Sequence, residues 1–173
     1  MCIRDRIDEA VQSVADAGPA KVVFSPANMI QPGEIADMVG TAANEFGGLD
    51  ILVNNAGIAV SNPDDFDRLN ELSDTRIEEM MSGVGINTPW AITENLTDED
   101  WHKMIDVHLT GTFYCAREAL RRMSASGRGG TIINMSSIAG LGGLENVPHY
   151  CACLLYTSPS PRDATLSRMP SSA

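Results

Sequence analysis

The chain of 173 residues is 43% hydrophobic and 20% charged, and its formal net charge is −11 at pH 7. This length predicts one domain, no apolar run reaches membrane-spanning length, and the negative charge argues against nucleic acid or an anionic membrane as a partner. No charged-then-apolar signal segment opens the chain, so we expect a cytoplasmic protein, and the cysteines lack the spacing of a metal site, so no metal is predicted.

The two ends of the sequence differ from the acidic, amphipathic part between them. The chain opens with MCIRDR, and from Cys153 onward it reads CLLYTSPSPRDATLSRMPSSA, without a hydrophobic period. Both stretches resemble translated read-through of a sequencing adapter. We therefore expect residues 1–6 and 153–173 to be non-native, the second as a tail that packs on nothing. A genuine disordered tail is the alternative.

Helical and strand patterns alternate within residues 7–152. Apolar residues at helical spacing predict a helix over 7–17, and Pro32 suits the first turn of another that runs to residue 46. Short apolar runs predict buried strands over residues 21–25, 49–53 and 131–134. Strands that alternate with helices at this spacing predict βαβ units and a parallel sheet.

A long helix is predicted to begin at Thr97 and to run to about residue 124. Its acidic first turn, Asp98-Glu99-Asp100, favours a helix start because carboxylates stabilise the positive end of the helix dipole. One face carries apolar and half-polar residues at helical spacing: Trp101, Met104, Ile105, His108, Leu109, Thr112, Phe113, Ala116 and Leu120.

The strongest functional pattern lies in the sequence TIINMSSIAGLGGLENVPHY, which ends at Tyr150. Its apolar strand runs into Ser136 and Ser137, and Tyr150 follows Ser137 by thirteen residues. A hydroxyl at the carboxyl end of a strand and a phenol on the next element can converge in the crevice where open α/β sheets bind ligands. This pattern resembles the catalytic Ser and Tyr of the short-chain dehydrogenase/reductase family, which implies a partial Rossmann-like, doubly wound fold.

The resembling pattern is one residue short of complete. The family has a Lys four residues after its Tyr, and this chain has Leu154 there. A tyrosine phenol ordinarily has a pKa of about 10, and nearby positive charge is needed to bring it close to the operating pH. In family members, that charge comes from the Lys and the oxidised nicotinamide.

The sequence Asn-Asn-Ala-Gly after strand 49–53 is the second mark of the resemblance. In the family, the residues at the positions of Asn54, Ala56 and Gly57 line the cofactor cleft, which implies NAD or NADP. The small side chains let a cofactor approach the backbone. Asn28 stands where the family usually has an Asp that touches the adenine, and an Asn can still donate and accept there.

His108 stands in a third resembling segment, Asp-Val-His-Leu-Thr-Gly over residues 106–111. The family segment normally holds a catalytic Asn, whose role is to hold a water of the proton relay through a backbone kink. A histidine ring nitrogen can bind the same water. A core histidine bonded to a carbonyl is an equally good interpretation.

Residues 59–85 lengthen the family's usual path between its Gly and the next helix. Ser73 is predicted to cap a helix in this insert that ends at Gly83. The helix would carry the apolar residues Ile77, Met80 and Met81. We expect either a flap over the substrate pocket or a surface or subunit-contact helix without a chemical role.

The family's Gly-x-x-x-Gly-x-Gly turn, which places the cofactor pyrophosphate at a helix N-terminus, follows no predicted strand. The resemblance thus covers about the middle half of a family member and lacks its first two strands. Because unpaired buried backbone is costly, we expect residues 21–25 to move beside 49–53 in a three-stranded sheet in chain order. The isolated protein is then expected to be loosely packed or aggregation-prone.

The resemblance implies an NAD(P)-dependent oxidoreductase that interconverts an alcohol and a ketone by hydride transfer. Tyr150 would be the general acid/base, Ser137 would bind the substrate oxygen and His108 would pass the proton on. We expect a small-molecule substrate, a homo-oligomeric full-length form, and no activity in the chain as written. A catalytically dead binding or regulatory protein, and a broken reading frame without function, are the alternatives.

Overall fold

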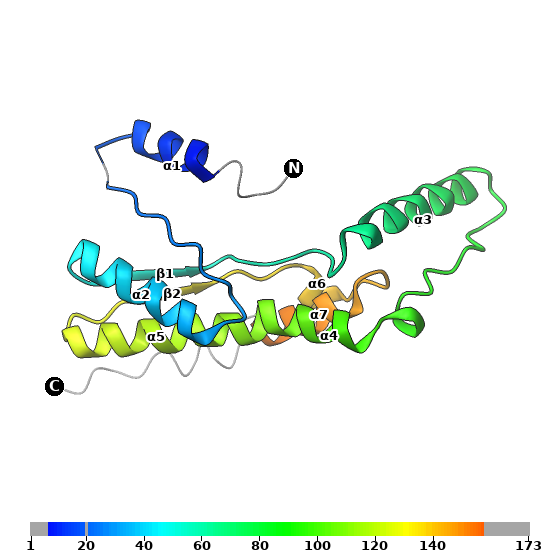
Figure 1. Cartoon of the computed structure of the whole chain (residues 1–173). Coiled ribbons are helices and arrows are strands. Elements are labelled where there is room, and N and C mark those ends of the chain that lie inside the picture. Colours follow the sequence, from blue (N-terminus) through cyan, green and yellow to red (C-terminus); the bar gives the residue numbers. More distant parts are fainter. Residues whose placement is uncertain (1–6, 20, 158–173) are drawn as a thin grey trace.

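The computed structural model describes residues 7–19 and 21–157 (Figure 1). In this part of the chain, helices pack beside one sheet of two parallel strands, so the fold class is α/β, as the sequence predicts. None of the described helices is long and apolar enough to cross a membrane.

The sheet consists of β1 (Ile51–Asn54) and β2 (Thr131–Asn134), paired in parallel from Ile51 opposite Thr131 to Asn54 opposite Asn134. At the carboxyl end, Asn54 Nδ2 donates to Asn134 Oδ1 over 2.8 Å. The pairing of these two strands, far apart in the sequence, confirms the prediction that they are neighbours.

The core lies where α2 (Pro32–Phe46) and α5 (Gly111–Ser126) pack beside the sheet (Figure 1). Ile35, Val39 and Cys115 are buried there, and Leu52 of β1 packs against them. Helix α2 has the predicted bounds because Pro32 fits its first turn and Gly47, with φ of 73°, ends it in the left-handed conformation. Phe46, the last residue of the helix, is 52% exposed.

The other face of the sheet is open in the described part of the chain. Ile51 is 61% exposed, Val53 52% and Ile133 43%. Parallel sheets normally have both faces covered. We therefore still expect the isolated chain to pack loosely or to aggregate, but because of this open apolar face and not because of the non-native strand pairing expected from the sequence.

The prediction of a third strand over residues 21–25 is wrong. After α1 (Ile7–Asp16), this segment is extended but joins no sheet, and Val23 and Phe24 are 38% and 48% exposed. Lys21 ties it to α2 instead, through an ion pair with Glu45 and a position 5.7 Å from the Phe46 ring centroid. An exposed backbone can bond to water, so the cost that was expected to drive it into the sheet does not arise.

The insert forms one long helix, α3 (Pro63–Met81), which projects from the rest of the molecule (Figure 1). The prediction that Ser73 caps it is wrong, because Ser73 lies inside the helix; the start at Pro63 fits the preference of Pro for a first turn. Gly83 follows its end with φ of 77°. The apolar side chains Ile77, Met80 and Met81 are 51%, 59% and 80% exposed.

The long helix predicted from Thr97 is present in three parts. Thr97 Oγ1 accepts from the Asp100 backbone N–H over 3.1 Å, which caps α4 (Asp98–Ile105). A turn of π-helix, η3 (Asp106–Thr110), then joins α4 to α5. Such turns often occur at functional sites, and this one holds His108.

The chain continues through α6 (Ala139–Gly142) into α7 (Pro148–Thr157). The expectation that the tail from Cys153 packs on nothing is wrong for its first residues, since Cys153 is 0% and Leu154 4% exposed. Both lie in α7, the helix that begins at Pro148 and contains Tyr150, so apolar burial orders them whatever their origin. Residues 1–6 and 158–173, also expected to be non-native, lie outside the described residues.

Candidate active site

A cleft opens at the carboxyl ends of β1 and β2. It brings together Asn54, Ala56, Gly57, His108 and Tyr150, all candidate site residues. Its other lining residues are Asn55, Ile58, Ala59, Thr112, Met135, Ser136 and Leu154. The position matches the crevice in which open α/β sheets bind ligands.

His108 is fixed in this cleft by the backbone that follows β1. The ring is 8% exposed, and its Nε2 lies 2.8 Å from the Ile58 carbonyl oxygen and 3.0 Å from the Ile58 nitrogen. Nε2 therefore has a partner in either tautomer: it donates to the carbonyl when protonated and accepts from the N–H when not. The contact fits both interpretations from the sequence, a relay residue and a histidine bonded to a carbonyl.

The close approach of His108 explains the glycine at position 57. A Cβ added to Gly57 would lie 2.5 Å from His108 Cε1, well inside van der Waals contact. Gly57 thus makes room for the His108 ring.

Tyr150 packs on the other side of His108. The ring centroids are 5.2 Å apart and the planes meet at 83°, an edge-to-face arrangement. Tyr150 comes from α7 and His108 from η3, so packing between these two helical segments places the phenol and the imidazole in one cleft.

The two serines after β2 have different surroundings. Ser136 lines the cleft, and its hydroxyl donates to the Leu154 carbonyl over 3.3 Å. Ser137 does not appear among the cleft residues; its Oγ accepts from the Ala139 N–H over 3.2 Å at the start of α6. The role of Ser137 in binding the substrate oxygen stays a prediction.

Leu154 takes the position of the family lysine inside the cleft. It is 4% exposed, and α6 approaches it so closely that a Cβ on Gly140 would lie 2.7 Å from the Leu154 carbonyl carbon. Next to it, burial raises the pKa of the Cys153 thiol to about 11, so this sulfur stays protonated at neutral pH. An apolar side chain thus fills the place where positive charge is expected.

Asn28 does not line the cleft with Tyr150. Its side-chain oxygen accepts from the Ile30 N–H over 3.2 Å, and its own N–H donates to Glu34 over 2.7 Å. These bonds shape the turn into α2. Contact between Asn28 and a cofactor adenine stays a prediction.

Sequence reasoning missed some of the cleft residues. Thr112 and Met135 line it, yet they lie on an amphipathic helix and beside a strand and carry no motif. The Ile58 backbone could not be found from side-chain patterns at all, because its contribution is a peptide group.

Comparison with known proteins establishes the family of this chain. The model of the short chain dehydrogenase family matches residues 2–83 and 75–153, so the chain belongs to this family. The two matches overlap over residues 75–83, at the C-terminal end of α3.

Individual relatives agree with that assignment. The cis-4-hydroxycyclohexanecarboxylate dehydrogenase of Sinomonas cyclohexanicum is 31% identical over 87% of this chain and 48% of its own length. The 3-alpha-(or 20-beta)-hydroxysteroid dehydrogenase of Mycobacterium tuberculosis H37Rv is 34% identical over 86% of this chain and 45% of its own. The chain thus spans about half the length of these curated relatives.

A solved structure gives the same result. The crystal structure of a short chain dehydrogenase from Mycobacterium smegmatis superposes with a TM-score of 0.66 and 25% identity. The match covers 88% of this chain and 51% of that one. The described part therefore has the arrangement of half a Rossmann-like dehydrogenase domain.

Proposed function

We propose that the full-length protein is an NAD(P)-dependent dehydrogenase that interconverts an alcohol and a ketone, and that this chain is about half of it. The observation that carries the proposal is the edge-to-face pair of His108 and Tyr150, 5.2 Å apart in the cleft at the carboxyl ends of the strands. Family membership and the partial coverage of relatives support it.

The cleft suits one end of a dinucleotide. Ala56 and Gly57 offer nearly bare backbone beside Asn54, so a flat ring and its ribose can approach closely. Neither of the described strands is followed by a Gly-x-x-x-Gly-x-Gly turn, the pattern that places a pyrophosphate at a helix N-terminus. We infer that Asn54, Ala56 and Gly57 would hold the nicotinamide half, and that the pyrophosphate site belongs to residues outside this chain.

The chain's own residues would handle the proton and the substrate oxygen. Bound NAD(P) would supply or accept the hydride. Tyr150 would donate a proton to the oxygen of a ketone or remove one from an alcohol. His108, held at Nε2 by Ile58, would pass that proton on through its other ring nitrogen. Ser137 would steady the substrate oxygen once its hydroxyl turns toward the cleft.

The chain as written should not catalyse this reaction. The buried Leu154 places no ammonium group beside Tyr150, and the pyrophosphate turn is missing from the sequence. The same buried leucine favours a second candidate, a binding or regulatory protein that has lost catalysis. The two candidates differ in whether Leu154 belongs to the natural gene.

Genomic sequencing on both sides of the fragment separates the candidates. For the enzyme, we expect a glycine-rich strand–helix turn about 30 to 50 residues before Ile7, the length of a βαβ unit. We also expect Ala or Ser and then Lys in place of Cys153 and Leu154. A contiguous natural gene that keeps Cys-Leu-Leu-Tyr at this point supports the catalytically dead protein and contradicts the enzyme.

Activity measurements complete the test. The full-length protein should oxidise or reduce a small alcohol or ketone with NAD(H) or NADP(H), and the 173-residue chain should neither react nor bind a nicotinamide cofactor in calorimetry. Micromolar cofactor binding by the chain would mean that its cofactor site uses residues other than those named above.

A further inference from the structure

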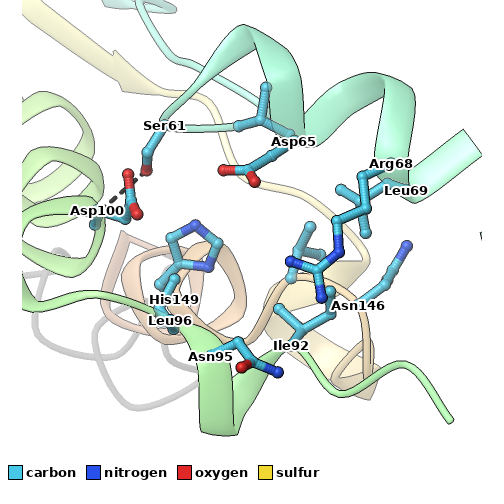
Figure 2. A pocket seen from close by; sticks show the side chains of 12 residues that line it. Ser61, Asp65, Arg68, Leu69, Ile92, Asn95, Leu96, Asp100, Asn146 and His149 are labelled. Atoms are coloured by element: carbon cyan, nitrogen blue, oxygen red, sulfur yellow. Dashed lines mark hydrogen bonds between the residues drawn. The ribbon is translucent and has the colours of Figure 1, made fainter.

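A second pocket lies beneath the N-terminal half of α3 and shares the first turn of α7 with the active-site cleft, since His149 lines the pocket and Tyr150 lines the cleft. Ser61, Asp65, Arg68, Asp100 and His149 line it (Figure 2). Its remaining wall is mostly apolar and consists of Val60, Leu69, Ile92, Asn95, Leu96, Asn146 and Val147. Such a mixture, apolar walls with a few convergent polar groups, is typical of a small-molecule site.

His149 is the unexplained polar residue of this pocket. Its side chain is 6% exposed, and its Nδ1 is fully buried without a hydrogen-bond partner in the described chain. A buried polar atom left unpaired destabilises a fold by about 1–3 kcal/mol. Figure 2 shows the imidazole among the lining side chains, where a ligand can supply the missing bond.

The charge of the pocket limits what that ligand can be. Burial lowers the pKa of His149 below its ordinary value. Asp100 and Asp65 raise this pKa and His108 lowers it, but burial has the largest effect. The imidazole is therefore neutral at pH 7. Asp65 and Asp100 then outnumber Arg68, which makes no ion pair with the described residues. A carboxylate ligand would meet net negative charge, whereas hydroxyl groups can donate to carboxylates and accept from a guanidinium.

The wall supplied by α3 is held in place at its far end. Glu79 accepts from the backbone N–H of Asn87 over 2.8 Å and from both the N–H and the hydroxyl of Thr88 over 3.0 and 2.7 Å. Arg76 lies 4.7 Å from the Trp90 ring centroid and 3.8 Å from Glu145, just before the lining residue Asn146. The insert is therefore tied to the loop that leads into α7.

The pocket adjoins the active-site cleft along two stretches of chain. Ala59 lines the cleft and Val60 lines the pocket; Tyr150 lines the cleft and His149 lines the pocket. A substrate that reacts at Tyr150 can thus have its far end received by residues one position away.

We propose that this pocket binds the far end of the substrate, and that His149 together with the α3 residues Asp65 and Arg68 selects neutral substrates with a second hydroxyl or keto oxygen. The inference rests on the proposed function and adds to it the chemical class of the substrate. It also gives the insert a role, since two of the selecting side chains come from α3.

Three probes that differ at one ring position test the selection: cyclohexanol, 1,4-cyclohexanediol and 4-hydroxycyclohexanecarboxylate. Their binding to the 173-residue chain is measured by ligand-detected NMR. One added hydrogen bond corresponds to about a tenfold change in affinity, so the diol should bind about tenfold more tightly than cyclohexanol, and the carboxylate more weakly than the diol. Equal binding of the diol and cyclohexanol overturns the proposal.

Variants assign the effect to the pocket. His149→Phe keeps a buried ring without nitrogens and should remove the preference for the diol, while cyclohexanol binds within about twofold as before. His102→Phe, at an exposed position of α4, is the matched control and should keep the preference. A preference that persists in His149→Phe contradicts the assignment.

If the isolated chain is too loosely packed to bind the probes, the same comparison in the full-length protein tests the pocket. There the ratio of KM for cyclohexanol to KM for the diol should fall about tenfold in His149→Phe, with kcat changed much less. Hydride transfer with an unchanged ratio overturns the pocket and keeps the dehydrogenase. His149-dependent diol binding without hydride transfer overturns the dehydrogenase and keeps the pocket as a ligand site.

Discussion

The active-site cleft and the pocket beneath α3 each contain a buried histidine, and the two differ in how their ring nitrogens are paired. His108, 8% exposed, has its Nε2 held by the Ile58 peptide on the far side of Gly57. His149, 6% exposed, has a buried Nδ1 without a partner in the described chain. A side chain paired by the protein is positioned for chemistry, whereas an unpaired one is suited to recognise a ligand. In the two proposals above, His108 serves the reaction and His149 serves the recognition of the substrate.

The largest effect should come from the phenol in the active-site cleft. In the full-length protein, Tyr150→Phe should lower kcat by about 100-fold or more, because general acid/base catalysis contributes that much. Steady-state kinetics with an alcohol substrate measures the change. His108→Ala should cost less, and His108→Asn should be tolerated. If His108→Asn proves as damaging as Tyr150→Phe, His108 has a structural or substrate-binding role and not a relay role.

A smaller effect should follow from crowding His108. In Gly57→Ala, the new Cβ would lie 2.5 Å from His108 Cε1, so the ring must move away from Ile58. Overpacking of this kind costs about 1–3 kcal/mol, which denaturant unfolding can measure, and kcat of the full-length protein should also fall. Gly33→Ala in α2 is the matched control because nothing lies within 4 Å of its added Cβ. Equal stability of the two variants would show that His108 is not held against Gly57.

The pocket side of the comparison predicts a pH dependence of stability. Because burial lowers the pKa of His149 below its ordinary 6.5, the unfolded chain binds a proton there before the folded chain does. The free energy of unfolding should therefore fall as the pH drops below about 6.5, before carboxylates protonate near pH 4.5 and below. Urea unfolding of His149→Phe should lack the loss in this upper window. Burial sets most of the size of this loss, and Asp100, Asp65 and His108 are the titratable groups that adjust it. A slope unchanged in His149→Phe would assign the loss to another group.

The smallest effect should come from the support of the pocket wall. Glu79→Gln weakens the acceptor of the Asn87 and Thr88 N–H groups, whose bonds lower the pKa of this carboxyl. Faster amide hydrogen exchange at Asn87 and Thr88 is the expected result, with little change in β1 and β2. Glu78→Gln, an exposed neighbour on α3, is the control. Unchanged exchange in Glu79→Gln would mean that the loop is ordered without this carboxylate.

Local sequence signals determined the helices whose ends carry capping residues or residues that favour a first turn. Pro32 and Gly47 bound α2, and Thr97 with its acidic first turn begins α4, because caps and first turns depend on residues within a few positions. The pairing of β1 with β2 followed from family resemblance, and the Asn54–Gly57, His108 and Tyr150 motifs identified most of the residues that meet in the cleft.

The tertiary structure decided what depends on neighbours distant in sequence. Residues 21–25 have the composition of a strand, but a strand needs a strand partner, and in the described chain Lys21 pairs with Glu45 and Phe46 of α2 instead. The sequence predicted that Cys153 and Leu154 belong to a non-native tail, yet packing against Met104 and α6 buries them. The missing bond of His149 could not be read from the sequence either, because an unpaired nitrogen is defined by every group that surrounds it. Composition and local spacing are properties of the chain, whereas burial, strand pairing and hydrogen-bond satisfaction are properties of the folded assembly of its segments.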